Sequence, residues 1–132
     1  VQKPHPPIYL AAFTPAGLKR AATMADGWNP AGMPADAMKQ MMEGIKGMAQ
    51  EAGRNPSEVV LVVRANILVT DEALGDDRWI FTGSSEQIKA DIAATREIGA
   101  AELFFDPTFS PDGVSVEGFL SRMEMVRERA SE

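Results

Sequence analysis

Apolar positions in this sequence fall into two alternating patterns: short continuous runs, and longer segments with helical spacing. The clearest helix is predicted at residues 38–52, where apolar side chains recur at every third or fourth position. These side chains are Met38, Met41, Met42, Ile45, Met48, Ala49 and Ala52. Gly53 stands where a left-handed C-cap is expected, and Pro56 prevents continuation. The spacing favours a buried helix face over an adaptable methionine-rich binding surface.

Two glycines inside this helix, Gly44 and Gly47, have two readings. Each weakens a helix by about 1 kcal/mol relative to alanine, or each permits close packing against a neighbour.

The segment before this helix predicts one strand–helix pair and a short strand. A strand is predicted at residues 8–12 and a helix from Pro15, because Thr14 can cap the helix and proline suits its first position. One face of this helix carries Leu18, Ala21, Ala22 and Ala25. Gly27 is expected to end the helix, and residues 27–29 are a short strand candidate.

The third strand is predicted at residues 59–69, which are rich in β-branched side chains. Alternation places Val63, Ala65, Ile67 and Val69 on one side of the strand. It places Arg64, Asn66 and Leu68 on the other side. A strand that is covered by helices on one side and carries polar groups on the other is typical of a barrel wall. An acidic stretch at 70–78 follows, and then an apolar loop or short strand at 79–83.

The C-terminal part repeats the alternation. A helix is predicted at residues 84–98, with capping-box spacing between Ser84 and Gln87 and a stop at Gly99. Its buried stripe includes Ile88, Ile92 and Ile98. Residues 103–105 are the fourth strand, and residues 110–113 are rich in turn formers. The last helix carries Phe119, Leu120, Met123 and Val126 on one face.

Strand followed by helix, four times over, predicts a single α/β domain over residues 1–132. Such an order favours a parallel sheet with right-handed crossovers. Alternation alone does not distinguish an open sheet from the wall of a barrel.

Composition removes several classes of function. The net charge of -6 with no basic stripe argues against a nucleic-acid partner. The absence of cysteine excludes disulfides and thiolate metal sites and makes the cytoplasm the expected location. His5, the single histidine, cannot build a zinc cluster and is expected on the surface. No apolar run approaches the length of a membrane span, and the start of the chain suggests a cut inside a longer gene.

A series of phrases resembles the second half of luciferase-like monooxygenases, in the order of that family. They are PPIYLAA at 6–12, LKRAA at 18–22, ADGWNP at 25–30, AGRNPSEV at 52–59, TGSSEQI at 82–88 and GAAEL at 99–103. The resemblance implies four units of an eight-stranded (β/α) barrel, a half of a TIM-type barrel. It also implies flavin mononucleotide (FMN) or a deazaflavin as coenzyme, and monooxygenation or hydride transfer as the reaction. The first half of the family's barrel supplies much of the pocket, so the chain alone is expected to be inactive.

The loop Ala12, Phe13, Thr14 and Pro15 is the predicted site of the coenzyme phosphate. It joins a strand end to a helix N-terminus, where free N–H groups and the helix dipole favour an anion. In relatives this loop commonly approaches the flavin phosphate, often with a glycine at the position of Thr14. A capped helix start with no ligand is the alternative.

Further candidates lie at other predicted strand ends, where barrel enzymes gather their sites. Trp28 and Asn29 are candidate coenzyme contacts, although packing is favoured for Trp28. Arg64 and Asn66 are candidates to orient a substrate in the barrel lumen, with pairing to an acidic neighbour as the favoured alternative. Asp106 is a candidate to bind a ribityl hydroxyl or to transfer a proton, with turn formation as its alternative. No catalytic residue is predicted.

Three functions fit this sequence. The chain is half of an oxidoreductase that needs a separate N-terminal half, or an assembly module that pairs its edges with another copy, or an inert fragment. Exposed sheet edges favour a homodimer, since two copies together offer eight strands.

Overall fold

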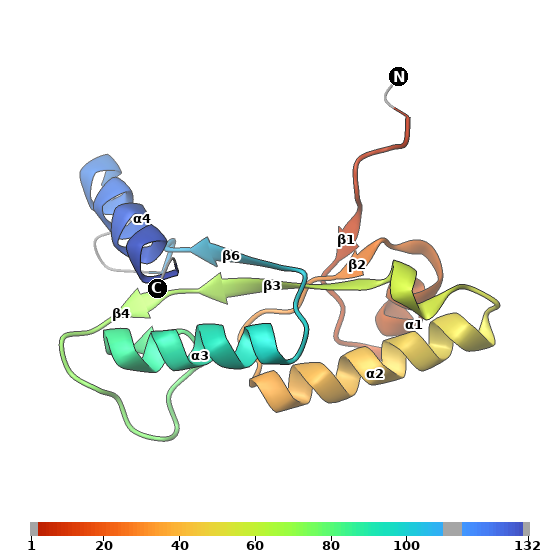
Figure 1. The fold of residues 1–132 in the computed structure, drawn as a ribbon, viewed down its shortest axis with the longest axis horizontal. Coiled ribbons are helices and arrows are strands. Elements are labelled where there is room, and N and C mark those ends of the chain that lie inside the picture. The colour runs from red at the N-terminus through yellow and green to blue at the C-terminus, as the bar shows by residue number, and fades with distance from the viewer. Residues whose placement is uncertain (1–2, 110–114, 131–132) are drawn as a thin grey trace.

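The structure is a computed structural model that describes residues 3–109 and 115–130. In chain order its elements are β1 (Tyr9–Leu10), α1 (Pro15–Met24), β2 (Gly27–Trp28), α2 (Ala35–Glu51), the 3-10 helix η1 (Pro56–Glu58), β3 (Val60–Asn66), β4 (Leu68–Val69), β5 (Thr82–Gly83), α3 (Ser85–Glu97), β6 (Glu102–Asp106) and α4 (Val116–Ala130). Helices α1, α2 and α3 lie on one side of the sheet, and α4 stands beyond the end at which β6 finishes (Figure 1). The predicted α/β alternation is confirmed.

Four parallel strands form the main sheet, in the order β1-β2-β3-β6. β4 follows β3 after one residue and pairs in parallel with β5 in a second sheet of two strands. The predicted strand 59–69 is therefore two strands. The chain changes its pairing partner at Ile67, leaving β2 and β6 and joining β5.

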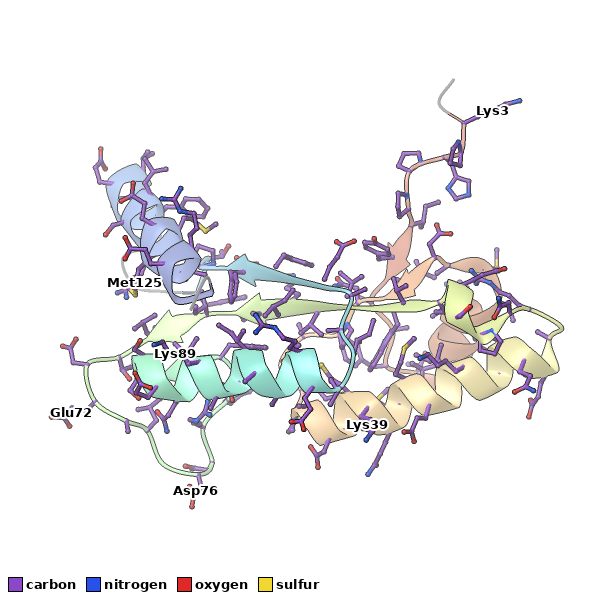
Figure 2. The ribbon with its side chains drawn as sticks, in the orientation of Figure 1. Lys3, Lys39, Glu72, Asp76, Lys89 and Met125 are labelled. Atoms are coloured by element: carbon purple, nitrogen blue, oxygen red, sulfur yellow. The ribbon has the colours of Figure 1, made fainter. Side chains whose placement is uncertain are left out.

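Burial confirms the predicted alternation along β3. Leu61, Val63 and Ala65 are at most 3% exposed and belong to the core cluster that includes the buried side chains of α1, α2 and α3. Arg64 and Asn66 alternate with these core residues along β3 and are only half-buried. Alternation puts them on the opposite face of the sheet, which α1, α2 and α3 leave uncovered (Figure 1). Charged side chains such as Lys39 point away from the sheet into solvent (Figure 2).

An arginine, not a glycine, ends α1. The helix stops at Met24, and Gly27 lies inside β2, so the predicted stop at Gly27 is wrong. Arg54 Nη1 donates hydrogen bonds to the carbonyl oxygens of Ala22 at 3.3 Å and Ala25 at 2.6 Å. These bonds satisfy the last carbonyls of α1, which a glycine C-cap would otherwise leave to backbone N–H groups.

The long helix α2 buries most of its predicted stripe, but Ala52 is exposed and follows the end of the helix at Glu51. Met38, Met42, Ile45 and Ala49 are buried. Gly53 has a φ of 77°, as expected for a left-handed C-cap. Gly44 and Gly47 are exposed, and a Cβ added at either would meet nothing within 4 Å. Close packing against a neighbour is therefore wrong for both glycines within the described chain.

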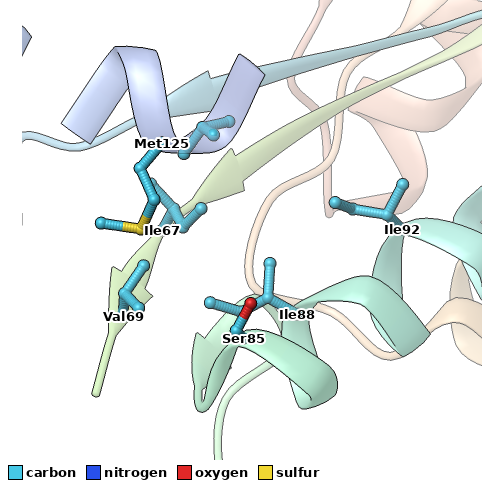
Figure 3. A pocket seen from close by; sticks show the side chains of 7 residues that line it. Ile67, Val69, Ser85, Ile88, Ile92 and Met125 are labelled. Atoms are coloured by element: carbon cyan, nitrogen blue, oxygen red, sulfur yellow. The ribbon is translucent and has the colours of Figure 1, made fainter. Parts of the chain in front are cut away.

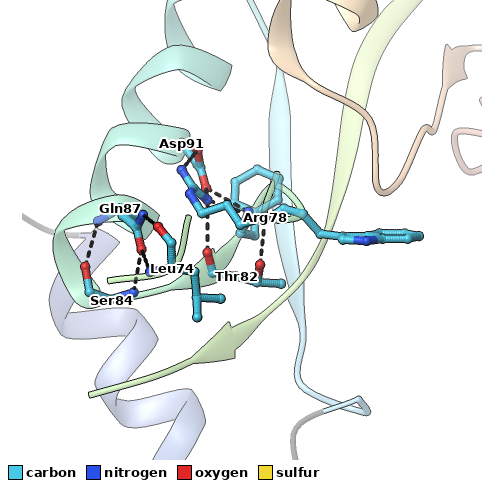
Figure 4. A network of polar contacts seen from close by, with 8 residues as sticks. Leu74, Arg78, Thr82, Ser84, Gln87 and Asp91 are labelled. Carbon is cyan, nitrogen blue, oxygen red and sulfur yellow. Dashed lines mark hydrogen bonds and ion pairs between the residues drawn. The ribbon is translucent and has the colours of Figure 1, made fainter. Parts of the chain in front are cut away.

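The acidic stretch and the start of the apolar segment form one loop, residues 70–81, which is pinned to α3 (Figure 4). The apolar segment ends in the short strand β5. Arg78 makes a two-point ion pair with Asp91, at 2.7 and 2.9 Å, and Asp91 also accepts the N–H of Phe81 at 2.7 Å. Gln87 bonds to both backbone groups of Leu74 while it completes the predicted capping box with Ser84. These bonds hold Phe81 buried at a φ of 63°, a left-handed conformation rare for aromatic residues.

The last helix is less buried than its pattern predicts. Val126 is buried, but Phe119, Leu120 and Met123 are 39%, 57% and 36% exposed. The prediction fails because α4 packs mainly against α3 and leaves the rest of its apolar face without a neighbour among the described residues. The predicted turn at 110–113 lies outside the described residues. No helix of the described chain has the length and apolar character to cross a membrane.

The centre of the sheet is packed so closely that it requires a glycine. A Cβ at Gly27 would lie 2.8 Å from Cδ1 of Tyr9 and 2.9 Å from the carbonyl oxygen of Val60. One neighbour is backbone, so relief would require the strands to move apart.

We therefore expect Gly27→Ala to destabilise the chain by about 2 kcal/mol or more, because overpacking at a core position strains the backbone. Gly44→Ala should instead stabilise it by about 1 kcal/mol, since the added methyl meets nothing and alanine favours the helix. Urea unfolding followed by circular dichroism measures both changes. Equal effects of the two substitutions would contradict this account of the sheet.

Candidate functional site

The loop predicted to bind phosphate begins at the end of β1 and leads into α1. Thr14 is the N-cap, and its Oγ1 accepts a hydrogen bond from the N–H of Gly17 at 3.2 Å. Pro15 has no N–H, and the N–H of Leu18 already bonds to the carbonyl of Thr14. Among the described residues, the first turn therefore has one N–H without an acceptor, that of Ala16. The geometry combines the capped helix start with a limited capacity for an anion.

The buried indole of Trp28 holds this loop in place through a hydrogen bond. Its ring is 0% exposed, and Nε1 donates a hydrogen bond of 2.8 Å to the carbonyl oxygen of Ala12. Trp28 thus offers no surface to a ligand in this structure, as packing predicts. Phe13, next to Ala12, is 55% exposed.

Asn29 ties the end of β2 to the middle of β3. Its Nδ2 donates a bond of 2.7 Å to the carbonyl oxygen of Val62, and its backbone N–H bonds to Leu10 at 3.0 Å. The side chain is half-buried, and alternation after the buried Trp28 puts it on the uncovered face of the sheet. Asn29 therefore lies between the loop after β1 and the polar groups of β3.

Arg64 and Asp106 form an ion pair across β3 and β6, as the favoured alternative predicts. Asp106 also accepts hydrogen bonds from the hydroxyl of Thr108 and, at 2.9 Å, from its N–H. The latter bonds form the predicted turn. The Thr108 hydroxyl, the Thr108 N–H and Arg64 lower the pKa of Asp106 below its ordinary 3.8, against an opposing effect of burial. Asp106 is therefore ionised at neutral pH, and both its oxygens accept hydrogen bonds.

Asn66 lies one rung further along the same face of β3. It is the register partner of Asp106, and its Oδ1 is buried with no hydrogen-bond partner among the described residues. The structure thus brings together Arg64, Asn66 and Asp106. The loop 12–15 lies at the end of β1, and β2 separates β1 from β3 in the sheet.

Sequence reasoning missed a polar contact at the opposite end of this face. The hydroxyl of Tyr9 on β1 donates a bond of 2.7 Å to Oε1 of Glu102 on β6, crossing the two strands between them. This bond raises the pKa of Tyr9 above its ordinary 10.0. A sequence separation of 93 residues leaves no local signal that could have found the pair.

Two other regions offer no polar site. A pocket under α4 is lined mainly by apolar side chains, including Ile67, Ile88 and Met125, with the Ser85 oxygen among them (Figure 3). His5 is exposed, as predicted, and lies 3.9 Å from Asp26. Over the described ranges, no three His, Cys, Asp or Glu side chains are grouped to hold a metal ion.

The lowered pKa of Asp106 makes the free energy of unfolding depend on pH. We expect Asp106→Asn to lower the free energy of unfolding at pH 7 by about 1 kcal/mol, since the variant loses bonds to a charged acceptor. Because the folded-state pKa of Asp106 is lowered, this contribution is present above the ordinary 3.8 and is lost as pH falls through the folded value. Urea unfolding at a series of pH values measures it.

Asp76→Asn, which changes an exposed carboxylate of the loop after β4, is the control and should leave stability unchanged at every pH. A deficit of Asp106→Asn that stays constant through the acid range would contradict the assignment.

Comparison with known proteins shows which family and which fold this chain resembles. A family model described as luciferase-like monooxygenase matches residues 1–74, more than half of the chain. An F420-dependent secondary alcohol dehydrogenase in complex with an F420-acetone adduct superposes with a TM-score of 0.69 at 14% identity, covering 97% of this chain and 50% of that one. The long-chain alkane monooxygenase LadA gives 0.64 at 16% identity, covering 94% and 41%.

A third structure is the coenzyme F420 dependent tetrahydromethanopterin reductase from Methanopyrus kandleri, with a TM-score of 0.58, 16% identity, and coverage of 80% and 46%. This chain therefore spans half or less of the length of the structures that it matches. At these identities the likeness is one of fold, that of part of a (β/α) barrel. The chain belongs to the luciferase-like monooxygenase family.

Proposed function

We propose that this chain acts as the C-terminal half of a flavin- or deazaflavin-dependent oxidoreductase and requires a complementary half for activity. The observation that carries this proposal is the sheet, whose outer strands β1 and β6 each have one edge without a partner strand among the described residues. A closed barrel has no such edges. The matched structures are at least twice as long as the part that this chain covers. A cytoplasmic location, supported by the absence of cysteine, goes with this function.

The coenzyme phosphate would bind at the loop Ala12, Phe13, Thr14 and Pro15. In support, the free N–H of Ala16 and the positive end of the α1 dipole suit an anion. The Thr14 oxygen accepts the bond from Gly17, so its own proton remains available to a phosphate oxygen. These groups suit a weakly bound phosphate, whose site other groups would complete.

A bound flavin or deazaflavin would supply the ring that accepts or donates a hydride. This chain's residues would position that coenzyme. Trp28 would act through the carbonyl of Ala12, which its indole N–H holds in place. Asn29 would face the coenzyme from the uncovered side of the sheet, where its amide is braced by Val62.

Titration with FMN and with coenzyme F420 tests the phosphate site. We expect Thr14→Ala to weaken coenzyme binding by about three- to tenfold, the loss of one hydrogen bond to a charged group. Thr14→Ser keeps the hydroxyl and should restore binding. Fluorescence of the coenzyme measures the dissociation constant.

Thr23→Ala is the matched control, because Thr23 lies on the same helix and donates only to Lys19. Its affinity should equal that of the unchanged chain. If neither coenzyme binds, the phosphate site belongs to other parts of the enzyme and the assignment of the loop fails.

Assembly without catalysis is the second candidate, and one observation favours it. Apolar side chains of α4, among them Phe119 and Leu120, are exposed together with the outer edges of β1 and β6. Exposed apolar surface and unpaired strand edges favour association. In this alternative, two copies of the chain form a homodimer whose two main sheets together have eight strands.

We accordingly expect sedimentation of the purified chain at micromolar concentration to give a dimer. Leu120→Asp, which places a charge on the exposed face of α4, should shift the equilibrium towards monomer. A monodisperse monomer of the unchanged chain would exclude the homodimer and leave a separate half as the partner.

A further inference from the structure

The uncovered face of the sheet carries two rungs of side chains near the ends of β3 and β6. Arg64 is the register partner of Phe104, and Asn66 is the register partner of Asp106. Side chains on partner positions of neighbouring strands lie on the same face, and the strands themselves are about 4.8 Å apart. Phe104 is 44% exposed there, so an aromatic surface lies beside the guanidinium.

Arg64 is held on one side only. Its Nη2 bonds to Oδ2 of Asp106, while Oδ1 of the same carboxylate accepts the two bonds from Thr108. The arginine is thus oriented by an aspartate that is itself oriented. In the part of the chain that the structure describes, no acceptor takes a hydrogen bond from Nε or Nη1. The Arg64 side chain is 41% exposed, so this edge is open to solvent.

A guanidinium has five N–H donors in a planar fork that matches two oxygens of an oxyanion. The bond to Asp106 uses one N–H of Nη2, and the N–H donors of Nε and Nη1 remain without an acceptor among the described residues. Asn66 adds an amide whose Nδ2 makes no hydrogen bond to the described residues and whose Oδ1 is buried.

We infer that Arg64 binds an oxyanion group of the substrate on this face, with an apolar part of the same molecule against Phe104. The ligand class is an organic carboxylate or phosphate. This subsite is separate from the coenzyme loop, which follows β1, two strands away in the sheet. That this ligand is a substrate rests on the proposed oxidoreductase function, whereas oxyanion binding itself requires only the residues described.

The test is a nuclear magnetic resonance titration of the 132-residue chain with benzoate, following the amide signals of Asn66 and Phe104. Benzamide, which has the same shape without the charge, is the matched ligand. We expect saturable shifts with benzoate and weaker binding of benzamide. Arg64→Gln should weaken benzoate binding by about tenfold, the effect of losing a charge-assisted hydrogen bond.

Arg20→Gln is the matched control, because Arg20 is exposed on α1 and far from this face; its affinity for benzoate should not change. Arg64→Lys keeps the charge beside Asp106 but lacks the fork, so its binding should fall several-fold while the chain stays folded. Inorganic phosphate, titrated in parallel, separates the two ligand classes: shifts at the same amides assign the subsite to oxyanions in general, and their absence assigns it to carboxylates.

Equal affinity of Arg64→Gln and the unchanged chain would overturn the inference, as would equal binding of benzamide and benzoate or no saturable shift with benzoate. The coenzyme titration is independent of this result. Coenzyme binding without benzoate binding refutes only the Arg64 subsite. Benzoate binding without coenzyme binding keeps the subsite and refutes the coenzyme loop.

Discussion

The arrangement of this chain depends on how closely a two-residue strand, β2, is held between β1 and β3. Asp26 makes bonds to both backbone groups of Ile8, at 2.7 and 2.9 Å, before the strand begins. Gly27 has no side chain, so Tyr9 can pass across the strand towards β6. Trp28 fills the core beneath. A strand this short contributes few ladder bonds, so the hydrogen bonds of Asp26 and Trp28 add to those that hold it in place.

The uncovered face carries polar groups at both ends of the strands. Tyr9 and Glu102 occupy the end at which the strands begin, and the polar groups of β3 and β6 lie towards the other end. Barrel enzymes of this class build their sites where parallel strands finish. Arg64 and Asp106 lie at that end, and the loop into α1 starts from it. These polar groups therefore lie along one rim of the sheet.

Three arginines show how the surroundings of a guanidinium decide how many of its donors are used. Arg54 is consumed by the last carbonyls of α1, and Arg78 by Asp91 and the loop carbonyls around it. Both are mostly buried, at 18% and 17% side-chain exposure, and their donors are directed inward. Arg64 is 41% exposed and paired through one nitrogen. The free edge of its guanidinium is what distinguishes it.

Local pattern determined much of this protein. The α/β order, the buried stripe of α2, the capping box of α3 and the two-sided character of β3 were all predictable, because each depends on spacing within one element. The sequence also placed Arg64 and Asn66 on the polar face and favoured an acidic partner for Arg64. Only the tertiary structure decided that the partner is Asp106, since 42 residues separate the two.

Other features were set by contacts between elements, which no local pattern encodes. Arg54 ends α1 from 29 residues away, so the glycine expected to stop that helix was free to serve in β2. The change of pairing partner between β3 and β4, at Ile67, depends on β5. The 12-residue loop at 70–81 connects β4 to β5 and so brings this strand alongside. The apolar face of α4 predicts that this face is covered, yet much of it has no neighbour among the described residues. Periodicity states which side chains need burial, and only the assembled fold supplies the neighbour.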